Sequence, residues 1–458
     1  MRTGSEALDR RYVFHPFTQL DRHADSDAPM IVSGKGVRLT DTRGRSYLDA
    51  MAGLWCVNVG YGRAEIADAL REEAARLGYY HAFSSMATEA PARLAERVLA
   101  LFPVPMSKVF FGNSGSDAND TQVKLVWYYN NALGRPAKKK IIARRSGYHG
   151  VTVMSAGLTG IDGVHKGFDV PLPMIRHARA PHRLWEAEPG EDDDAFARRL
   201  ADELEQLILA EGPETVAAFI AEPVQGAGGV LVPPATYFEH IQEVLRRHDV
   251  LLIADEVITG FGRLGHWFGS GALGIQPDLV TVAKGITSGY FPLSACLVSE
   301  RVWSVLVEGS AELGPFGHGY TYSAHPLGAA AALANLDVLE RDDLVQQAAE
   351  RGAHMQALLR SAFGDHPLAG EVRGTGLIGA VEFVAAKAPP EQFDPARKVG
   401  ARIARRCLDH GLITRALPAR DTIAFSPPFV VSEAELDEMV AIARRATDEV
   451  AAELAGEH

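Results

Sequence analysis

The 458-residue sequence is poor in cysteine and has no long apolar run, and each shortage excludes a class of protein. It has only three cysteines, Cys56, Cys296 and Cys407, and no CxxC pair, so neither a disulfide framework nor a zinc knuckle is expected. No segment approaches the roughly 20 apolar residues that cross a bilayer. The N-terminal MRTGSEALDRR lacks the apolar stretch of a signal peptide. These absences predict a soluble, cytoplasmic protein.

Positive charge is also scarce. There are 46 Lys and Arg residues against 58 Asp and Glu, which gives a net charge of −12. Without a dominant basic stripe, we expect neither a nucleic-acid partner nor a membrane partner. Hydrophobic residues make up 47% and charged residues 23%, which are ordinary globular values and exclude a disordered chain. At about 150 residues per domain, the length predicts two or three domains.

Several common catalytic motifs are missing. The sequence has no GxxxxGK[ST] loop, no GxGxxG after a strand, no HExxH and no GxSxG. Nucleotide hydrolysis, nicotinamide chemistry, zinc proteolysis and the lipase-type triad therefore lose support. The acidic stretch 188–194 is interpreted as a solvated surface loop rather than a metal site, and no metal is expected. The lysines at 138–140 are interpreted as a solvated lead-in to a strand.

Apolar runs of strand length alternate with helical patterns in the middle of the chain. Strands are expected at 108–111, 141–143, 216–221, 250–254, 279–283 and 293–298, and a clear helix at 235–248. Continuous apolar strands separated by helices are typical of a largely parallel sheet covered on both faces. The pattern therefore predicts a large α/β domain over residues 61–325.

The two flanks have a different pattern. A short meander is expected within 30–50, and the C-terminal part mixes strands at 377–383, 412–414 and 423–425 with a helix at 397–410. Ser432 and Glu435 form a capping box that predicts the start of a last helix. We therefore expect a small α+β domain built from both chain ends, residues 1–60 and 326–458.

Three features at expected strand ends could carry chemistry. Ser114-Gly115-Ser116 lies between a strand and a helix, where backbone N–H groups attract phosphate, although taken alone an ordinary serine N-cap is the favoured interpretation. Asp255 follows an apolar strand and either faces a ligand or caps the next segment. Lys284 ends the next strand. It is interpreted either as a lysine that forms a Schiff base or as one whose side chain extends to solvent. Together, phosphate cradle, acid and lysine are what pyridoxal phosphate requires.

At this point the sequence resembles the class III aminotransferases. The segments LLIADEVITGFGRLG and HWFGSGALGIQPDLVTVAKGITSG carry the family signature, and the resemblance runs from His15–Thr18 to Ser426–Phe429. It implies an α/β protein of pyridoxal-phosphate fold type I, similar to aspartate aminotransferase, with a mostly parallel large domain and a small α+β domain. It also implies pyridoxal 5'-phosphate, ping-pong kinetics and a homodimer with shared active sites, while a tetramer stays open.

The resemblance further implies the role of each site residue. Lys284 would bind the cofactor covalently, Asp255 would pair with its pyridine nitrogen, and Tyr148 would stack on its ring. Thr321 would reach the phosphate from the neighbouring subunit. The implied cofactor-binding set is Ser114, Gly115, Ser116, Tyr148, His149, Glu222, Val224, Asp255, Val257, Lys284 and Thr321.

Within the class, the sequence is most similar to the amine:pyruvate subgroup, through GLWCVNVGYGR and GLITRALPARDTIAFSPPF. The implied substrate pocket comprises Trp55, Tyr148, Phe83, Ala227, Ile258 and Arg415. Its apolar wall would accept a primary amine, an aralkyl amine or diamine, and Arg415 would hold the carboxylate of pyruvate or a similar 2-oxo acid. Trp55 could instead be plain interface packing, and Arg415 a surface ion pair.

Two other reactions remain open at this stage. The donor could be an amino acid of the β-alanine, taurine or 4-aminobutyrate type, or the fold could serve an aminomutase or decarboxylase. A non-catalytic cofactor-binding protein is a third class, against which the intact set of catalytic residues argues. The sequence departs mildly from the family at Asp117, commonly glutamate, and at Thr259, often cysteine in subgroup relatives.

Overall fold

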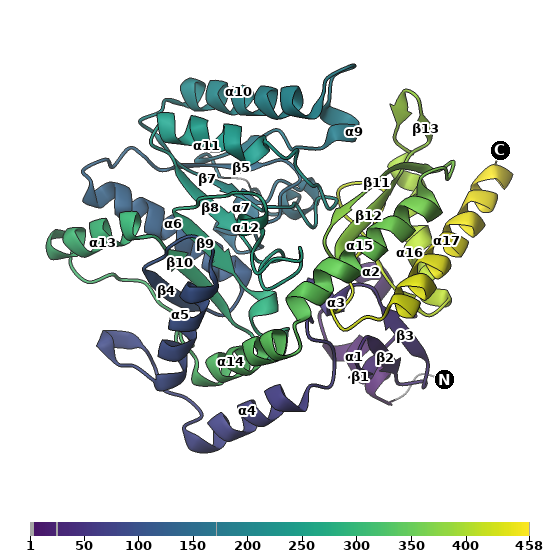
Figure 1. The fold of residues 1–458 in the computed structure, drawn as a ribbon, viewed down its shortest axis with the longest axis horizontal. Coiled ribbons are helices and arrows are strands. Elements are labelled where there is room, and N and C mark those ends of the chain that lie inside the picture. Colours follow the sequence, from purple (N-terminus) through teal and green to yellow (C-terminus); the bar gives the residue numbers. More distant parts are fainter. Residues whose placement is uncertain (1–3, 24–25, 171, 458) are drawn as a thin grey trace.

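The computed structural model describes residues 4–23, 26–170 and 172–457, and its centre is a seven-stranded sheet (Figure 1). The strands follow the spatial order β4-β10-β9-β8-β7-β5-β6. Their bounds are Lys108–Gly112 (β4), Lys140–Arg144 (β5), Ile175–Ala178 (β6), Val216–Ala221 (β7), Leu251–Asp255 (β8), Leu279–Val282 (β9) and Ser294–Val298 (β10). The five strands from β9 to β6 are parallel, whereas β10 runs antiparallel to both β9 and β4.

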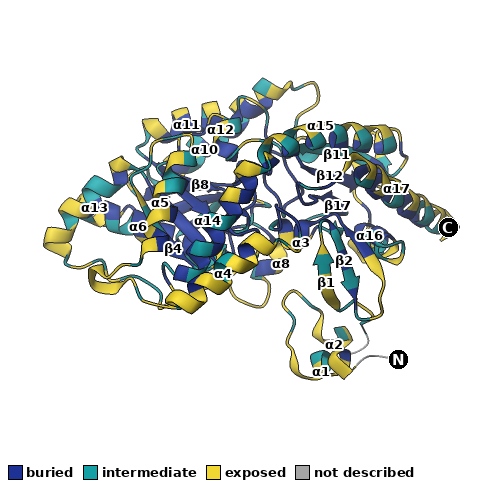
Figure 2. Ribbon diagram, turned by 60° about the horizontal axis from the view of Figure 1, so that its bottom comes forward, coloured by how far each residue is buried: buried dark blue, intermediate teal, exposed yellow. Residues whose placement is uncertain are grey.

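The expectation of a mostly parallel sheet in an α/β protein is therefore confirmed. Every residue of β7 and β8 is buried, as expected for parallel strands covered on both faces. One layer contains α6 (Gly115–Ala132) and α13 (Glu300–Leu313), and the opposite layer contains α10 (Asp193–Glu211) and α11 (Tyr237–Arg247). In Figure 2 the strands of the central sheet are mostly dark blue, which marks buried residues, and the outer faces of the helices are largely yellow, which marks exposed residues.

Both chain ends contribute to one of the smaller sheets. That sheet has the order β1-β2-β3-β15, with β1 at Ile31–Lys35, β2 at Arg38–Asp41, β3 at Ser46–Asp49 and β15 at Leu412–Ile413. A second sheet has the order β11-β12-β17-β16, with β11 at Ala369–Thr375, β12 at Ile378–Phe383, β16 at Arg415–Ala416 and β17 at Thr422–Phe425. A small hairpin joins β13 (Ala386–Lys387) and β14 (Pro390–Glu391).

The remaining helices surround these sheets. They are α1 (Gly4–Tyr12), α2 (Leu20–His23), α3 (Ala52–Trp55), α4 (Ala64–Arg76), α5 (Glu89–Leu101), α7 (Val153–Leu158), α8 (Asp162–His165), α9 (Arg183–Glu186), α12 (Gly269–Ala272), α14 (Pro326–Arg341), α15 (Leu344–Phe363), α16 (Val399–Asp409) and α17 (Glu433–Gly456). Short 3-10 turns are η1 (Phe83–Ser85), η2 (Lys284–Ile286) and η3 (Pro395–Arg397). The division into residues 61–325 and the two flanks stays a prediction.

Most sequence expectations differ from the observed elements only at their ends. The helix expected at 235–248 is α11, and the helix expected at 397–410 is α16. Ser432 accepts a hydrogen bond from Glu435 N, so the predicted capping box at the start of α17 is confirmed. The strands β6 and β11 were not expected, because their runs contain arginine and other polar residues.

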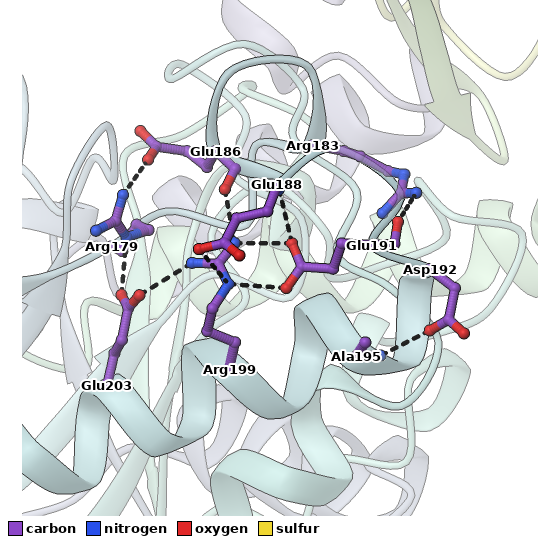
Figure 3. A network of polar contacts seen from close by, with 9 residues as sticks. All are labelled: Arg179, Arg183, Glu186, Glu188, Glu191, Asp192, Ala195, Arg199 and Glu203. Carbon is purple, nitrogen blue, oxygen red and sulfur yellow. Dashed lines mark hydrogen bonds and ion pairs between the residues drawn. The ribbon is translucent and has the colours of Figure 1, made fainter.

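The acidic stretch 188–194 lies on the surface at the start of α10, as expected. Figure 3 shows Glu188 and Glu191 of this stretch paired with Arg199. Arg199 donates from Nε and Nη2 to the two oxygens of Glu191, at 2.7 and 2.8 Å. This two-pronged contact lowers the pKa of Glu191 to about 2. Asp192 caps α10 by accepting from Ala195 N at 2.8 Å. The stretch therefore forms the N-terminal end of α10 and the turn before it, and Arg199 stabilises it.

The interpretation of the lysines at 138–140 as solvated is wrong for the first of them. Lys138 is buried, and its Nζ donates to the carbonyl oxygens of Pro213 and His248, each at 3.2 Å. It therefore ties the chain before β5 to the turns before β7 and β8. Among the described residues, no helix is both long and apolar enough to span a membrane.

Candidate active site

The expected site residues lie at the carboxyl ends of parallel strands, along one edge of the sheet. Asp255 is the last residue of β8, Lys284 follows β9 by two residues, and Glu222 directly follows β7. The segment 147–150 comes after β5, and α6 begins after β4. Because the carboxyl ends of parallel strands meet at the same edge, residues far apart in sequence converge there.

Asp255 is buried and takes part in a dense set of hydrogen bonds. Its Oδ2 atom lies 2.8 Å from His149 Nδ1 and accepts from Asn119 Nδ2, also at 2.8 Å. Among the described residues, its Oδ1 accepts only from Val257 N, at 3.1 Å. Within the described chain, Oδ1 is the oxygen with room for a further donor.

Glu222 lies beside this group and is fixed by backbone donors. Its Oε1 accepts from Tyr148 N at 3.0 Å, and its Oε2 accepts from Gly226 N at 2.9 Å. Burial raises the pKa of Glu222, and the neighbouring Asp255 raises it further. Glu222 therefore ties the 147–150 segment to the loop that follows β7.

Lys284 is held in an uncommon backbone conformation at the start of η2. Its φ is +48°, a left-handed value that is uncommon for residues other than glycine. Burial lowers the pKa of its amine, while Cys56, Asp255 and Glu222 lie close enough to oppose that shift. Its Nζ has no hydrogen-bond partner among the described side chains and backbone groups. A half-buried, unpaired amine of lowered pKa is suited to act as a nucleophile and base.

The N-terminus of α6 shows that the serine N-cap and the phosphate cradle are compatible. Ser114 is the N-cap and accepts from Asp117 N at 3.1 Å, while Asp117 accepts in return from Ser114 N. The backbone N–H groups of Gly115 and Ser116 have no acceptor in the described part of the chain. Val257 packs on Gly115, where a Cβ atom would lie 3.1 Å from its Cγ2. The helix therefore presents free N–H groups close to Asp255.

An apolar wall lies next to Glu222. A Cβ atom at Gly226 would lie 2.5 Å from Ile258 Cδ1 and 3.1 Å from Trp55 Cζ3, so the two side chains meet over this glycine. Trp55 is buried and has a φ of +64°, within an α3 segment whose backbone is irregular. Val224 belongs to the same apolar cluster, and Ala227 packs with Tyr148 in a neighbouring one. Trp55 is therefore an interior residue of this chain.

Arg415 lies on β16 and is half-buried. Its guanidinium has no hydrogen bond and no ion pair among the described residues, so the surface ion pair considered from sequence does not form there. Burial lowers the pKa of its guanidinium, and Tyr148 and Lys284 lie within electrostatic range. An unpaired, partly desolvated arginine is suited to bind a carboxylate.

Phe83 and Thr321 do not join this group in the described chain. Phe83 is 46% exposed, and its ring lies 3.3 Å from a Cβ placed on Gly319. Thr321 is exposed nearby and its carbonyl accepts from Tyr79 Oη at 2.6 Å. Their expected places in the substrate pocket and at the phosphate therefore stay predictions that require a second subunit.

Sequence reasoning missed several residues that build this region. Asn119 lies in a helix, where nothing in the pattern marks it, whereas Thr281 is a hydroxyl in an otherwise apolar strand and was a usable signal. Arg373 on β11 donates from Nε to the carbonyl of Gly229 at 2.8 Å, in the loop that presents Gly226. Its Nη2 lies 2.6 Å from Oε2 of the buried Glu382. Through Arg373, the second small sheet therefore contacts the loop that carries Gly226 and helps to hold it in place.

This group of residues fits a ligand that carries three different chemical groups. The unpaired Lys284 amine suits a carbonyl carbon, the open Oδ1 of Asp255 suits a protonated ring nitrogen, and the free N–H groups of α6 suit a phosphate. No part of this set offers the cluster of ligands that a catalytic metal requires.

A family model described as aminotransferase class-III matches residues 21–447. The chain is 50% identical to a diaminobutyrate–2-oxoglutarate transaminase of Halomonas elongata, covering 96% of this chain and 95% of the relative. It is 48% identical to a gamma aminobutyrate transaminase of Solanum lycopersicum, covering 93% and 81%. A solved ω-transaminase of Pseudomonas jessenii in complex with PMP superposes with a TM-score of 0.95 at 47% identity, covering 98% of each chain.

Proposed function

This chain belongs to the class III aminotransferases, is a pyridoxal-phosphate-dependent transaminase with the α/β fold of that family, and on this basis we propose that it is an amine:pyruvate aminotransferase. In this proposal it moves an amino group from a primary amine, such as an aralkyl amine, a diamine or an ω-amino acid, to pyruvate or a similar 2-oxo acid.

The observation that carries the proposal is the apolar wall beside the lysine. Trp55 and Ile258 meet over Gly226, and Cys56, the next residue after Trp55, lies within electrostatic range of the Lys284 amine. A carboxylate placed against such a wall would lose its hydration without gaining a hydrogen-bond partner. That loss costs at least about 2 kcal/mol of binding free energy. The wall therefore favours donors that carry no carboxylate next to the reacting amine.

Arg415 supplies the complementary half of the proposal. Its guanidinium has no partner among the described residues, and it lies near Tyr148, which forms part of the expected wall. A guanidinium can bind a carboxylate with two parallel hydrogen bonds, so a 2-oxo acid would satisfy it. The same pocket would thereby serve an uncharged side chain in one half-reaction and an acid in the other.

The geometry at the sheet edge supports the cofactor-binding roles that the family resemblance implies. We assign the phosphate to the N–H groups of Gly115 and Ser116 with the hydroxyls of Ser114 and Ser116, and the pyridine nitrogen to Asp255. Tyr148, His149, Glu222, Val224 and Val257 line the same space. When bound to Lys284, pyridoxal phosphate supplies an electron sink that stabilises negative charge on the substrate carbon.

Lys284 has two tasks in this scheme. Its amine is the nucleophile that binds the cofactor, and once displaced by the substrate amine it moves a proton away from the substrate carbon. Burial favours the neutral form that both tasks require, because it lowers the pKa of the amine. The left-handed backbone at Lys284 fixes where this amine is presented.

We also propose a homodimer in which each subunit completes the other's site. Phe83 and Thr321 lie on an exposed face that carries further large apolar side chains, among them Tyr79, Tyr80 and Tyr322. Apolar surface of this kind marks an interaction site. In the dimer, Thr321 would reach the partner's phosphate and Phe83 the partner's substrate pocket.

An amino-acid donor is the second candidate, and Arg415 itself favours it. A cation that holds the carboxylate of an oxo acid could equally hold that of a γ- or ω-amino acid. The relatives named for diaminobutyrate and gamma aminobutyrate use donors of that chemistry by name. The difference between the two candidates is therefore whether a carboxylate on the donor is required.

The test is an absorbance titration of the cofactor-loaded protein with single donors, followed by an acceptor. An aralkyl amine and a diamine represent the first candidate, and 4-aminobutyrate, β-alanine and diaminobutyrate represent the second. Pyruvate and 2-oxoglutarate are then added separately to restore the original band. Loss of the band with the carboxylate-free amines and recovery with pyruvate would support the proposal. A response only to amino acids would overturn it in favour of the second candidate.

A further inference from the structure

Asn119 lies in α6, and both ends of its side-chain amide make hydrogen bonds. It is 1% exposed. Its Nδ2 donates to Asp255 Oδ2 at 2.8 Å and to the carbonyl of His149 at 2.7 Å, and its Oδ1 accepts from Thr281 Oγ1 at 2.8 Å. A buried amide is costly unless its partners are all present. Here one side chain joins α6, β8, β9 and the segment after β5.

The partners determine which way the amide faces. The carbonyl oxygen of His149 has no hydrogen to donate, so the atom of Asn119 that faces it and Asp255 Oδ2 must be the NH2 nitrogen. If the amide were reversed, its oxygen would lie against a carboxylate oxygen and a carbonyl oxygen. The carbonyl oxygen of Asn119 then faces Thr281, whose hydroxyl donates to it. Thr281 therefore holds the amide in the orientation that donates to Asp255.

The same contacts divide the two oxygens of Asp255 into different roles. Oδ2 faces two donors, His149 Nδ1 and Asn119 Nδ2, which use its two lone pairs. Among the described residues, Oδ1 accepts only from Val257 N and keeps one lone pair. Together, the two donors to Oδ2 prevent the carboxyl group from rotating.

We propose that Asn119, held by Thr281, is a positioning residue that fixes the orientation of the Asp255 carboxyl group and directs its Oδ1 to the pyridine nitrogen of the cofactor. The inference rests on the cofactor-binding role proposed for Asp255. It does not depend on which amine is the donor. Asn119 touches neither the substrate nor the reacting carbon and acts only through Asp255.

The test compares two cofactors whose only difference is the ring nitrogen. The dissociation constants of pyridoxal phosphate and of its 1-deaza analogue, which has a C–H in place of that nitrogen, are measured by absorbance on wild-type protein and on Asn119→Leu. Losing a hydrogen bond to a charged group corresponds to roughly a tenfold to hundredfold weaker complex. We expect a loss of that size for pyridoxal phosphate and little change for the analogue. Equal weakening of both would overturn the proposal, because it would indicate general damage to the site.

Variants of Thr281 keep the test decisive if Asn119→Leu does not fold. Thr281→Val removes the hydroxyl at nearly constant volume, and Thr281→Ser retains it. We expect Thr281→Val to reduce the preference for pyridoxal phosphate over the analogue at least several-fold and Thr281→Ser to retain it. If Thr281→Val also retained the full preference, the orienting role would be wrong. A failed amine titration would leave these affinities unchanged, so the two proposals fail independently.

Discussion

Asp255 on β8 is the direct register partner of Thr281 on β9. Since Lys284 follows Thr281 by three residues, this single pairing fixes the separation of the acid and the amine across the sheet edge. A change in register by one residue would turn each side chain to the other face of the sheet. The position of the amine relative to the acid is therefore a property of the sheet and is not left to a flexible loop.

We predict that Lys284→Ala abolishes steady turnover. The substitution removes both the covalent attachment and the base, so the rate should fall by roughly a thousandfold or more. Steady-state assays with the best donor and pyruvate measure it. Lys387→Ala, at an exposed lysine on β13, is the matched control. Turnover of Lys284→Ala at the wild-type rate would contradict the assignment.

The stability of the cofactor-free protein should depend on pH through the same amine. The pKa of Lys284 is lowered in the folded state, so between that value and the ordinary lysine value of 10.5 the unfolded chain binds more protons. Stability from this residue therefore rises with pH across that window. We expect Lys284→Met to raise the melting temperature at neutral pH by roughly 1–3 °C and to bring little gain in strongly alkaline buffer. Thermal unfolding of both proteins across the pH range checks it; an identical gain at every pH would be inconsistent with an effect of the amine's charge.

Arg415→Met should separate the two half-reactions. The amine half-reaction needs no guanidinium, so its rate should stay within a fewfold of wild type. The 2-oxo acid loses a charged, bidentate partner, and its KM should rise roughly tenfold to hundredfold. Single-turnover absorbance measurements of each half-reaction give the two values. Arg405→Met, at an exposed arginine paired with Asp409, serves as the control. Equal slowing of both halves would indicate a structural role.

Trp55→Gly should enlarge the range of amine donors. Removing the ring opens the space over Gly226, and glycine adopts the φ of +64° without strain. We expect a gain in kcat/KM of roughly tenfold for amines with a second bulky substituent. The lost packing should cost about 3 kcal/mol of stability or somewhat more, partly offset by the relaxed backbone. Trp55→Phe, which keeps an aromatic ring, should show neither effect. A variant that folds but gains no activity on bulky amines would place Trp55 outside the substrate pocket.

The buried carboxylate of Glu382 should contribute to stability in a pH-dependent way. Burial alone would raise its pKa, but the hydrogen bond with His182 and the charge of Arg373 lower it to about 2. Its contribution is therefore present above the unfolded value of 4.5 and is lost as the pH falls towards 2, a difference of about 3 kcal/mol. Glu382→Gln should remove this dependence and destabilise the protein at neutral pH, because Arg373 would lose one of its two carboxylate partners and keep only Glu371.

Denaturant unfolding across acidic and neutral pH measures this effect. Glu391→Gln, at an exposed glutamate on β14, is the control and should follow the wild-type profile. A Glu382→Gln protein as stable as wild type at neutral pH would show that the cluster with Arg373 contributes nothing to the fold.

The parts of the site that lie on single apolar strands were accessible from sequence. Asp255 and Lys284 each end a continuous apolar run, and such runs become buried parallel strands whose ends share one edge. The direction of β10 was not accessible, because an antiparallel strand buried on both faces has the same composition as its parallel neighbours. Lys138 was misjudged because an isolated lysine run shows nothing of the two carbonyls that the fold brings to it.

Residues that act through partners distant in sequence escaped prediction for a related reason. Asn119 matters only because β8 and β9 place Asp255 and Thr281 against it. Arg415 was singled out through resemblance alone, and only the fold shows that it is half-buried and has no partner within the described chain. Patterns along a chain reveal burial and periodicity, whereas the pairing of polar groups is decided by tertiary packing.

The parallel pairing of β15 with β3 has a consequence for the order of folding. Leu412 pairs with Leu48, so the first sheet to be synthesised lacks its fourth strand until nearly the whole chain has left the ribosome. Loop closure over such a distance is slow, and the unpaired edge of β3 stays open to other chains in the meantime. The yield of folded enzyme should therefore depend on how long the nascent N-terminal sheet is protected, more than on the strength of the central sheet.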